Sequence, residues 1–251
     1  EPYPLITLGD DERGYSTGYA LRKGGNFNRK YYANGGGYTA APCFRAVEAL
    51  LNYMEASYEL NHTIDGTADS YWRAIRTRAN VDPNYNKTIS LTDMNKEAEN
   101  DWGAYSAGAL LTDRTLYNIR RERRCELLSE GFRDADLKRW RSYDQLITSP
   151  AHLEGMHLWN TPMQDWYTDL VWNEANANVS APEKSEYLRP FERTEGQAAY
   201  NGCTWRMAHY LNPIAMQHFM ITSTDDRDAY SDSPIYQNPY WPVKANYPAE
   251  K

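Results

Sequence analysis

Cysteine is scarce in this sequence and follows no pattern. Three cysteines occur among 251 residues, at Cys43, Cys125 and Cys203. They lie far apart and form no CxxC pair, which argues against a zinc knuckle and against a disulfide framework. A single bridge is compatible with three thiols, but we expect buried free thiols, because unpaired cysteine behaves as a small apolar residue.

Long apolar runs and an excess of positive charge are also missing. No apolar stretch approaches the roughly 20 residues that a membrane-spanning helix needs. The formal net charge is −7, and the densest basic run, 120–124, has a glutamate at its centre and acids after it. A nucleic-acid-binding surface needs lysine and arginine gathered on one face. We therefore expect an ion-paired helix at 120–124 and no nucleic-acid partner.

Sequence signatures of catalysis and metal binding are absent as well. The chain has no GxSxG, P-loop, GxGxxG, HExxH or EF-hand pattern,. Its five histidines lack the spacing of metal ligands, and the acidic run 225–228 is better interpreted as a solvated loop than as a calcium site,. We expect no cofactor and no metal. A catalytic pair of carboxylates is recognised by the distance between them, and a sequence with 34 acidic residues does not give that distance,.

Polar aromatic residues are abundant, with 21 Tyr and 8 Trp against 5 Phe. Tyr and Trp combine an apolar ring face with a hydrogen-bonding edge, which suits half-wet surfaces that hold ligands. For any single ring, packing within the fold is the plainer interpretation.

Apolar residues at three- and four-residue steps predict an amphipathic helix over 45–60,. A second helix is expected to begin near Asp69 and to end at 81–83, which gives an antiparallel helical hairpin. One hairpin cannot bury its own apolar face, so further helices must pack on it. The expected buried faces are Phe44, Val47, Leu50, Leu51, Met54 and Tyr58 in the first helix, and Tyr71, Trp72, Ile75 and Ala79 in the second.

Helical patterns continue to residue 143. The run Leu91-Thr92-Asp93 is a candidate cap of a short helix within the otherwise ambiguous stretch 84–112, and Asp113 is the expected N-cap of a longer helix,. Gly131 should end or kink that longer helix, and another helix is expected over 133–143.

Periodicity is lost over residues 148–203, which contain four prolines. A stretch of this length without its own pattern is typical of a functional excursion. A short strand-like run at 206–211, a brief helix over 215–219 and an extended aromatic tail are expected after it.

The most specific segment is the charged stretch 119–140. Glu122 and Glu126 are one helical turn apart, as are Arg120 and Arg124, a spacing that supports ion pairs within a helix. Two helices that meet at a glycine can also lock together by bidentate arginine–carboxylate bonds. An acid–base or anion site is the alternative, but we favour a structural charge network. It comprises Glu122, Arg123, Arg124, Glu126, Glu130, Arg133, Asp136 and Arg139.

This charged stretch resembles the signature of the SusD/RagB family. Segment 42–56 is similar to the helix that precedes this signature in the family. Segment 210–214 resembles the family's YLxPIP element, with Ala215 in place of the second proline, and 237–241 resembles its QNPGW ending, with Tyr240 in place of glycine. The signature residues are Glu122, Arg123, Arg124, Glu126, Leu127, Glu130, Gly131, Arg133, Asp136, Leu137, Arg139 and Trp140.

The resemblance implies a mainly α fold, in which tetratricopeptide-like helical hairpins form an α-superhelical scaffold with long irregular loops. Residues 1–251 would be the C-terminal region of a larger protein, with 148–203 as a loop-rich insertion. Family members are non-catalytic lipoproteins that face outward on the outer membrane of Bacteroidetes-type bacteria. They pass captured glycans or peptides to a SusC-like TonB-dependent porin. The lipid anchor of the full-length protein is expected to lie outside this chain.

The shared motifs belong to the scaffold, so the ligand site has to be proposed from chemistry. Rigid aromatic rings cover the apolar faces of sugars at low entropic cost, and function concentrates in loops. The candidate ligand residues are Trp102, Tyr105, Trp159, Trp166 and Tyr167. We expect capture of an oligosaccharide or polysaccharide without catalysis. A glycoside hydrolase and a peptide-binding adaptor are the alternatives, because fold alone does not choose among them.

Overall fold

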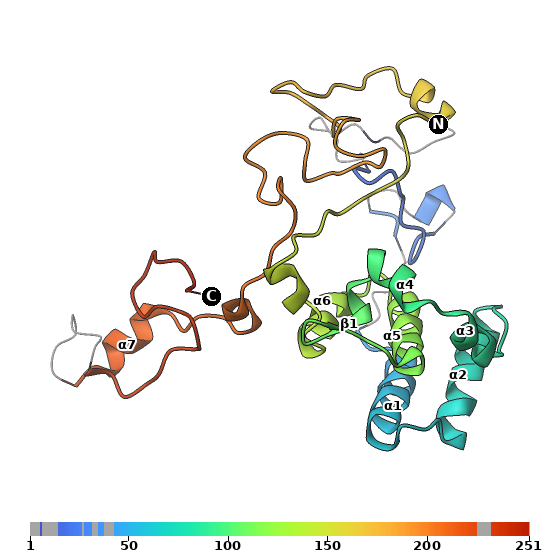
Figure 1. Cartoon of the computed structure of the whole chain (residues 1–251), viewed down its shortest axis with the longest axis horizontal. Helices are drawn as coiled ribbons and strands as arrows, with labels where there is room; N and C mark the ends of the chain where they lie inside the picture. Colours follow the sequence, from blue (N-terminus) through green and yellow to red (C-terminus); the bar gives the residue numbers. More distant parts are fainter. Residues whose placement is uncertain are drawn as a thin grey trace.

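The structure is a computed structural model that describes residues 6, 15–26, 28–31, 35–37, 43–224 and 232–250. Within these residues the chain is mainly α-helical, which confirms the expected fold class. The acidic run 225–228 and Pro42 lie outside the described residues. Figure 1 shows a helical scaffold with α1 to α6, a loop region above it and a C-terminal arm to one side. We define the scaffold as 43–147, the loop region as 148–203 and the arm as 206–224 plus 232–250.

The expected helical hairpin is present as α1 (Ala46–Asn61) and α2 (Gly66–Arg78). Between them the chain turns at His62, which has a left-handed backbone with φ of 52°. Asp65 caps α2 by accepting the Ala68 amide at 2.8 Å. The same carboxylate accepts the Ser57 hydroxyl of α1 at 2.6 Å, so one aspartate both begins α2 and ties it to α1,.

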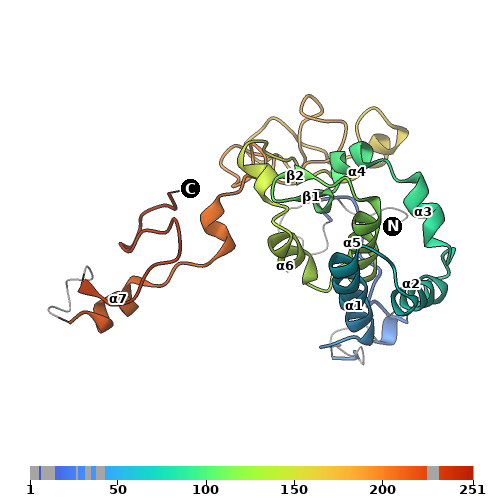
Figure 2. The same ribbon diagram turned by 60° about the horizontal axis from the view of Figure 1, so that its bottom comes forward.

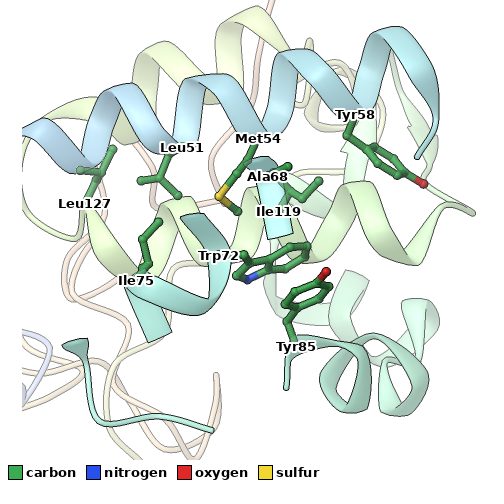
Figure 3. Close-up of a cluster of buried hydrophobic side chains, with 9 residues drawn as sticks. All are labelled: Leu51, Met54, Tyr58, Ala68, Trp72, Ile75, Tyr85, Ile119 and Leu127. Carbon is green, nitrogen blue, oxygen red and sulfur yellow. The ribbon is translucent and has the colours of Figure 1, made fainter. Parts of the chain in front are cut away.

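One apolar core joins this hairpin to α3 (Tyr85–Leu91) and α5 (Arg114–Glu126) (Figure 3). Trp72 and Tyr85 stack with ring centroids 4.1 Å apart and ring planes 2° apart. Trp72 is 1% exposed, so its large ring contributes strongly to the burial that stabilises the fold,. The buried cluster consists of Leu51, Met54, Tyr58, Ala68, Trp72, Ile75, Tyr85, Ile119 and Leu127.

Short elements connect these helices to α6. As expected, Asp93 caps a short helix, α4, by accepting the Asn95 amide, and Asp113 caps α5 by accepting the amides of Thr115 and Leu116. Gly131, with φ of 84°, allows the sharp turn between α5 and α6,. The remaining elements here are α4 (Met94–Asn100), the 3-10 helix η2 (Trp102–Ala104), the antiparallel pair β1 (Tyr105–Ser106) and β2 (Ala109–Leu110), α6 (Phe132–Arg139) and the 3-10 helix η3 (Asp144–Ile147).

Several expectations about local structure were wrong. Phe44 is 90% exposed because α1 begins at Ala46, and Ala79 is exposed because α2 ends at Arg78. Helix α3 was not expected, and α6 ends at Arg139 instead of reaching 143. The three cysteines are free, but Cys43 and Cys125 are exposed and Cys203 is half-buried, so the described thiols are not core residues.

The loop region forms a small core without regular sheets or long helices. A β-bridge joins His157 to Tyr187, and the Leu188 amide donates to the Met156 carbonyl at 3.0 Å. Within this region only the 3-10 helix η4 (Pro162–Trp166) is regular among the described residues. Its buried cluster is Ile6, Met156, Leu158, Trp159, Val179 and Leu188.

The C-terminal arm extends away from the scaffold (Figures 1 and 2). It contains the 3-10 helix η5 (Met207–Tyr210), where a strand-like run was expected, and α7 (Met216–Thr222). The two C-terminal motifs of the sequence meet here. Gln237 accepts the Ile214 amide at 2.8 Å and donates to the Ile214 carbonyl at 2.8 Å, while the Trp241 indole donates to the Ala208 carbonyl at 2.8 Å. We call this set of contacts the clasp.

Candidate functional site

A charge network with Glu55, Arg123 and Asp136 buried at its centre joins α1, α5 and α6. Arg123 donates through Nε to both carboxylate oxygens of Asp136, at 3.0 and 2.8 Å. Arg139 forms a bidentate pair with Glu55 at 2.7 and 2.5 Å, and the Trp140 indole donates to Glu55 at 2.5 Å. Burial lowers the pKa of Arg139, but its bonds to Glu55 and Asp136 outweigh this and raise the pKa above its ordinary value. Buried ions are tolerated when paired in this way.

A second group of charges is centred on Asp101, at the end of α4. This carboxylate is 4% exposed, forms an ion pair with Arg124 at 2.7 Å and accepts a hydrogen bond from Arg133 at 2.5 Å. The Gly103 amide donates to it at 2.9 Å and the Tyr117 hydroxyl at 3.1 Å. Burial raises the pKa of Asp101, but Arg133 and Arg124 outweigh that and hold the pKa below its usual value,.

The remaining members of the predicted network also pair with other elements. Glu122 accepts from Arg76 of α2 at 2.9 Å, Glu126 from Arg45 at 2.5 Å, and Glu130 pairs with Arg45 as well. These side chains form ion pairs with other elements and not the expected ion pairs within α5. Because α5 lies between α1, α2, α4 and α6, its charged groups reach neighbours at shorter range than one another. Their role in holding the helices together stays a prediction.

A cleft of about 850 Å³ lies between the scaffold and the loop region. From the scaffold it is lined by Trp102 and Tyr143, whose rings meet edge to face with centroids 5.8 Å apart. From the loop region it is lined by segment 150–154 and Arg189. The volume falls within the range of small-ligand sites. We call it the interface cleft.

Charges on the walls of the interface cleft balance. Three arginines face three carboxylates, and each arginine is bonded to a carboxylate. Arg189 donates to Glu154 at 2.9 and 2.8 Å, so these two side chains are fixed relative to each other. The result is an ordered array of hydrogen-bond donors and acceptors beside an indole ring. The wall arginines are Arg124, Arg133 and Arg189, and the wall carboxylates are Glu99, Asp134 and Glu154.

The surroundings of Glu154 shift the pKa of its carboxyl group. Burial raises its pKa, but the Ser185 hydroxyl, at 2.8 Å, and Arg189 outweigh this and lower the pKa below its usual value. A general acid of a glycoside hydrolase needs a raised pKa. Glu154 is therefore suited to accept hydrogen bonds from a ligand and poorly suited to donate a catalytic proton.

The five aromatic candidates do not come together. Trp102 lines the interface cleft, whereas Tyr105 is half-buried against the cluster around Ala104. Trp166 is 49% exposed at the end of η4, and Tyr167 packs half-buried on the core of the loop region. Their roles as ligand contacts stay predictions.

Trp159 is buried in the core of the loop region. It is 5% exposed, its indole donates to the Ser180 carbonyl at 3.2 Å, and Trp172 lies edge to face with it at 4.9 Å. The loop region has a core of its own, and this ring fills it. A ligand contact by Trp159 stays a prediction.

Sequence reasoning did not assign Tyr143, His152 or Arg189 to the site. They come from three separate segments, and none belongs to a motif. A local signal existed only for segment 150–154, which begins with a proline near the start of the aperiodic stretch 148–203.

In the described part of the chain no helix is both long and apolar enough to cross a membrane. Within the same residues no three metal-ligating side chains lie close enough together to hold an ion.

The helices and the interface cleft define a helical-scaffold protein with a ligand-sized surface site. The chain belongs to the SusD family, whose model matches residues 7–246. This confirms the family resemblance read from the motifs, and it indicates a glycan- or nutrient-binding surface protein of a generally non-catalytic kind. No curated protein and no solved structure shows a significant match to the chain.

Proposed function

We propose that this protein captures a glycan in the interface cleft without cleaving it. The observation that carries the proposal is the combination of the half-buried Trp102 ring, which lines the cleft, with a wall of fixed, paired polar groups. Sugars present apolar C–H faces to an aromatic ring and hydroxyl groups to donors and acceptors on either side. A wall that is already ordered before binding loses little entropy when the ligand arrives.

The ligand of this proposal is a neutral glycan. The arginines of the cleft already bond to carboxylates, Arg124 and Arg133 to Asp101 and Arg189 to Glu154. Glu192, which is buried and lies 3.5 Å from Arg189, adds a further acid. A uronic acid would bring another negative charge next to these groups, which like-charge repulsion disfavours. Hydroxyl groups, by contrast, can both donate to the carboxylates and accept from the arginines.

We further propose that the captured glycan passes to a SusC-like TonB-dependent porin, and that the full-length protein is held by a lipid at the outward face of the outer membrane. Membership of the SusD family supports both statements. Cross-linking in intact cells tests them, since a porin attached to the protein supports delivery and its absence opposes delivery.

The capture proposal is tested by native gel electrophoresis through neutral and uronic polysaccharides, with reducing-sugar release measured in the same mixtures. Retardation by a neutral polysaccharide without sugar release is the expected result. Sugar release that is lost on substitution of Glu99, Asp134 or Glu154 would establish the hydrolase alternative instead.

Two tryptophan variants locate the site. Trp102→Ala should weaken the retarding interaction about tenfold, which corresponds to about 1.4 kcal/mol. Trp166→Ala, which removes an exposed indole outside the cleft, should leave binding unchanged. A loss in the second variant alone would move the site to the loop region. Far-ultraviolet circular dichroism checks that both variants are folded.

A further inference from the structure

A second cleft, of about 500 Å³, lies where the arm leaves the scaffold, and we call it the arm cleft. Its walls are mostly apolar and include Met207, Leu211 and Pro239 from the arm, with the rings of Tyr210 and Tyr240. The exposed fractions of Leu211 and Tyr240 are 51% and 40%. Lining residues of this cleft are distinct from those of the interface cleft.

The rim of the arm cleft carries positive charge. Lys138, Arg139 and Arg141 line it, and no acidic residue does among the described residues. Their side chains are 37, 44 and 52% exposed. Two of their carboxylate partners, Glu55 and Asp144, are no more than 9% exposed and lie behind the arginines. In these two pairs the cations are therefore exposed to solvent and the anions are not.

Helix ends explain only part of this arrangement. Cations near the last turn of α6 interact favourably with the helix dipole, which accounts for Lys138 and Arg139. Arg141 lies beyond the helix, and its backbone is left-handed with φ of 53°. The dipole also gives no reason for an exposed apolar wall beside three cations, on a chain whose net charge is −7. Exposed apolar surface rimmed by charge is typical of an interaction site.

We propose that the arm cleft docks a segment of a partner polypeptide in which an apolar side chain is flanked by acidic residues. The apolar side chain would enter between Leu211 and Tyr240, and the acidic residues would meet the cations of the rim. The three cations follow one another over 138–141, so they suit several carboxylates along a chain better than a single anionic group. Such charge complementarity selects partners and speeds their association.

The test uses an array of decapeptides with a central Leu, Ile, Phe or Tyr, flanked by Asp and Glu, by Asn and Gln, or by Lys and Arg. The acidic set should bind the intact chain, and the Kd of its best member is then measured by fluorescence polarisation. The double variant Lys138→Gln with Arg141→Gln should raise this Kd at least tenfold, and so should Leu211→Asn. Raising the salt from 50 to 500 mM should weaken binding as well.

Lys87→Gln is the matched control, because Lys87 is an exposed cation outside the arm cleft and its loss should leave the Kd unchanged. Thermal unfolding of each variant must match the parent chain. Equal binding of neutral or basic peptides, an unchanged Kd in the double variant, or no saturable peptide binding overturns the proposal. Saturable binding of decanoate without any peptide binding also overturns it, since the cleft would then take a small anionic amphiphile.

Discussion

The helical scaffold and the loop region each bury a tryptophan, but their surroundings differ. Trp72 lies among helices, stacks on Tyr85 and donates its indole N–H to the ion-paired Glu122 at 2.9 Å. Trp159 lies among turns, and its indole reaches a backbone carbonyl of the same region. Helices satisfy their own backbone groups, whereas the loop region must satisfy its backbone through scattered turns and bridges,.

This difference bears on function. A region with few regular hydrogen bonds opens locally at lower free energy than a helical core does. The interface cleft has one wall from each region. The wall with Trp102 belongs to the helical scaffold, and the wall with the ordered Arg189–Glu154 pair belongs to the region whose backbone opens at lower free energy,. The expected consequence is that substitutions in the scaffold change global stability, whereas substitutions in the loop region change local opening and ligand binding.

The largest expected loss of unfolding free energy follows the removal of a buried charge from the scaffold. Asp136→Ala leaves the buried Arg123 without its carboxylate, which should cost about 3–5 kcal/mol of unfolding free energy. Urea unfolding measures this. Lys87→Ala is the control, since Lys87 is an exposed partner of Asp82 at 3.9 Å and its loss should cost no more than about 1 kcal/mol,. Equal losses in both variants would mean that the network does not hold the helices.

Two leucines sharpen the comparison between the regions. Leu51, in the scaffold core, is 0% exposed, and Leu188, in the loop-region core, is 1% exposed. Leu51→Ala should lower the global unfolding free energy by about 2–5 kcal/mol. Leu188→Ala should instead speed amide hydrogen exchange within 154–192 while α1 keeps its protection. Global destabilisation by both variants would show that the two regions unfold as one unit.

A smaller effect is expected at the clasp of the arm. Gln237→Ala removes the partner of the Ile214 amide, a loss of about 1–3 kcal/mol that should be confined to the arm,. Exchange of the Ile214 amide should accelerate, while exchange in α5 stays the same. Unchanged exchange at Ile214 contradicts this role for Gln237.

The smallest effect concerns acid. Asp101 has a pKa below its usual value in the folded chain, so its contribution to stability is present above the unfolded pKa and is lost as the pH falls through the folded pKa,. The unfolding midpoint should therefore drop as the pH is lowered below about 4. Asp101→Asn should be less stable than the parent at pH 7 and should show a shallower acid dependence. If the unfolding midpoints of both proteins fall equally with pH, the acid dependence does not come from Asp101.

The scaffold was largely predictable from the sequence, because its helices carry their own signals. Asp93, Asp113 and Gly131 mark helix ends through local chemistry, and apolar periodicity marks the core face. The partners of α5 were not predictable in the same way. Glu55 pairs with Arg120 of α5 and Asp101 with Arg124, both from positions distant in the chain, and no periodicity links them to the signature.

The interface cleft was mostly beyond sequence reasoning. Trp102 was among the candidates and lines the cleft, whereas Trp159 lies in the core of the loop region, which no periodicity in 148–203 announces. The cleft depends on how Arg189 and segment 150–154 fold back onto α6, and this tertiary contact leaves no pattern in the chain.

The most direct test of the account is hydrogen–deuterium exchange of the intact chain with and without the polysaccharide that retards it most. Glycan capture in the interface cleft predicts slower exchange at 99–103, 133–134, 150–154 and around Arg189, with no change in α1 or α2. Slower exchange confined to 163–173 would contradict it, because the glycan would then bind at the exposed aromatic residues of the loop region.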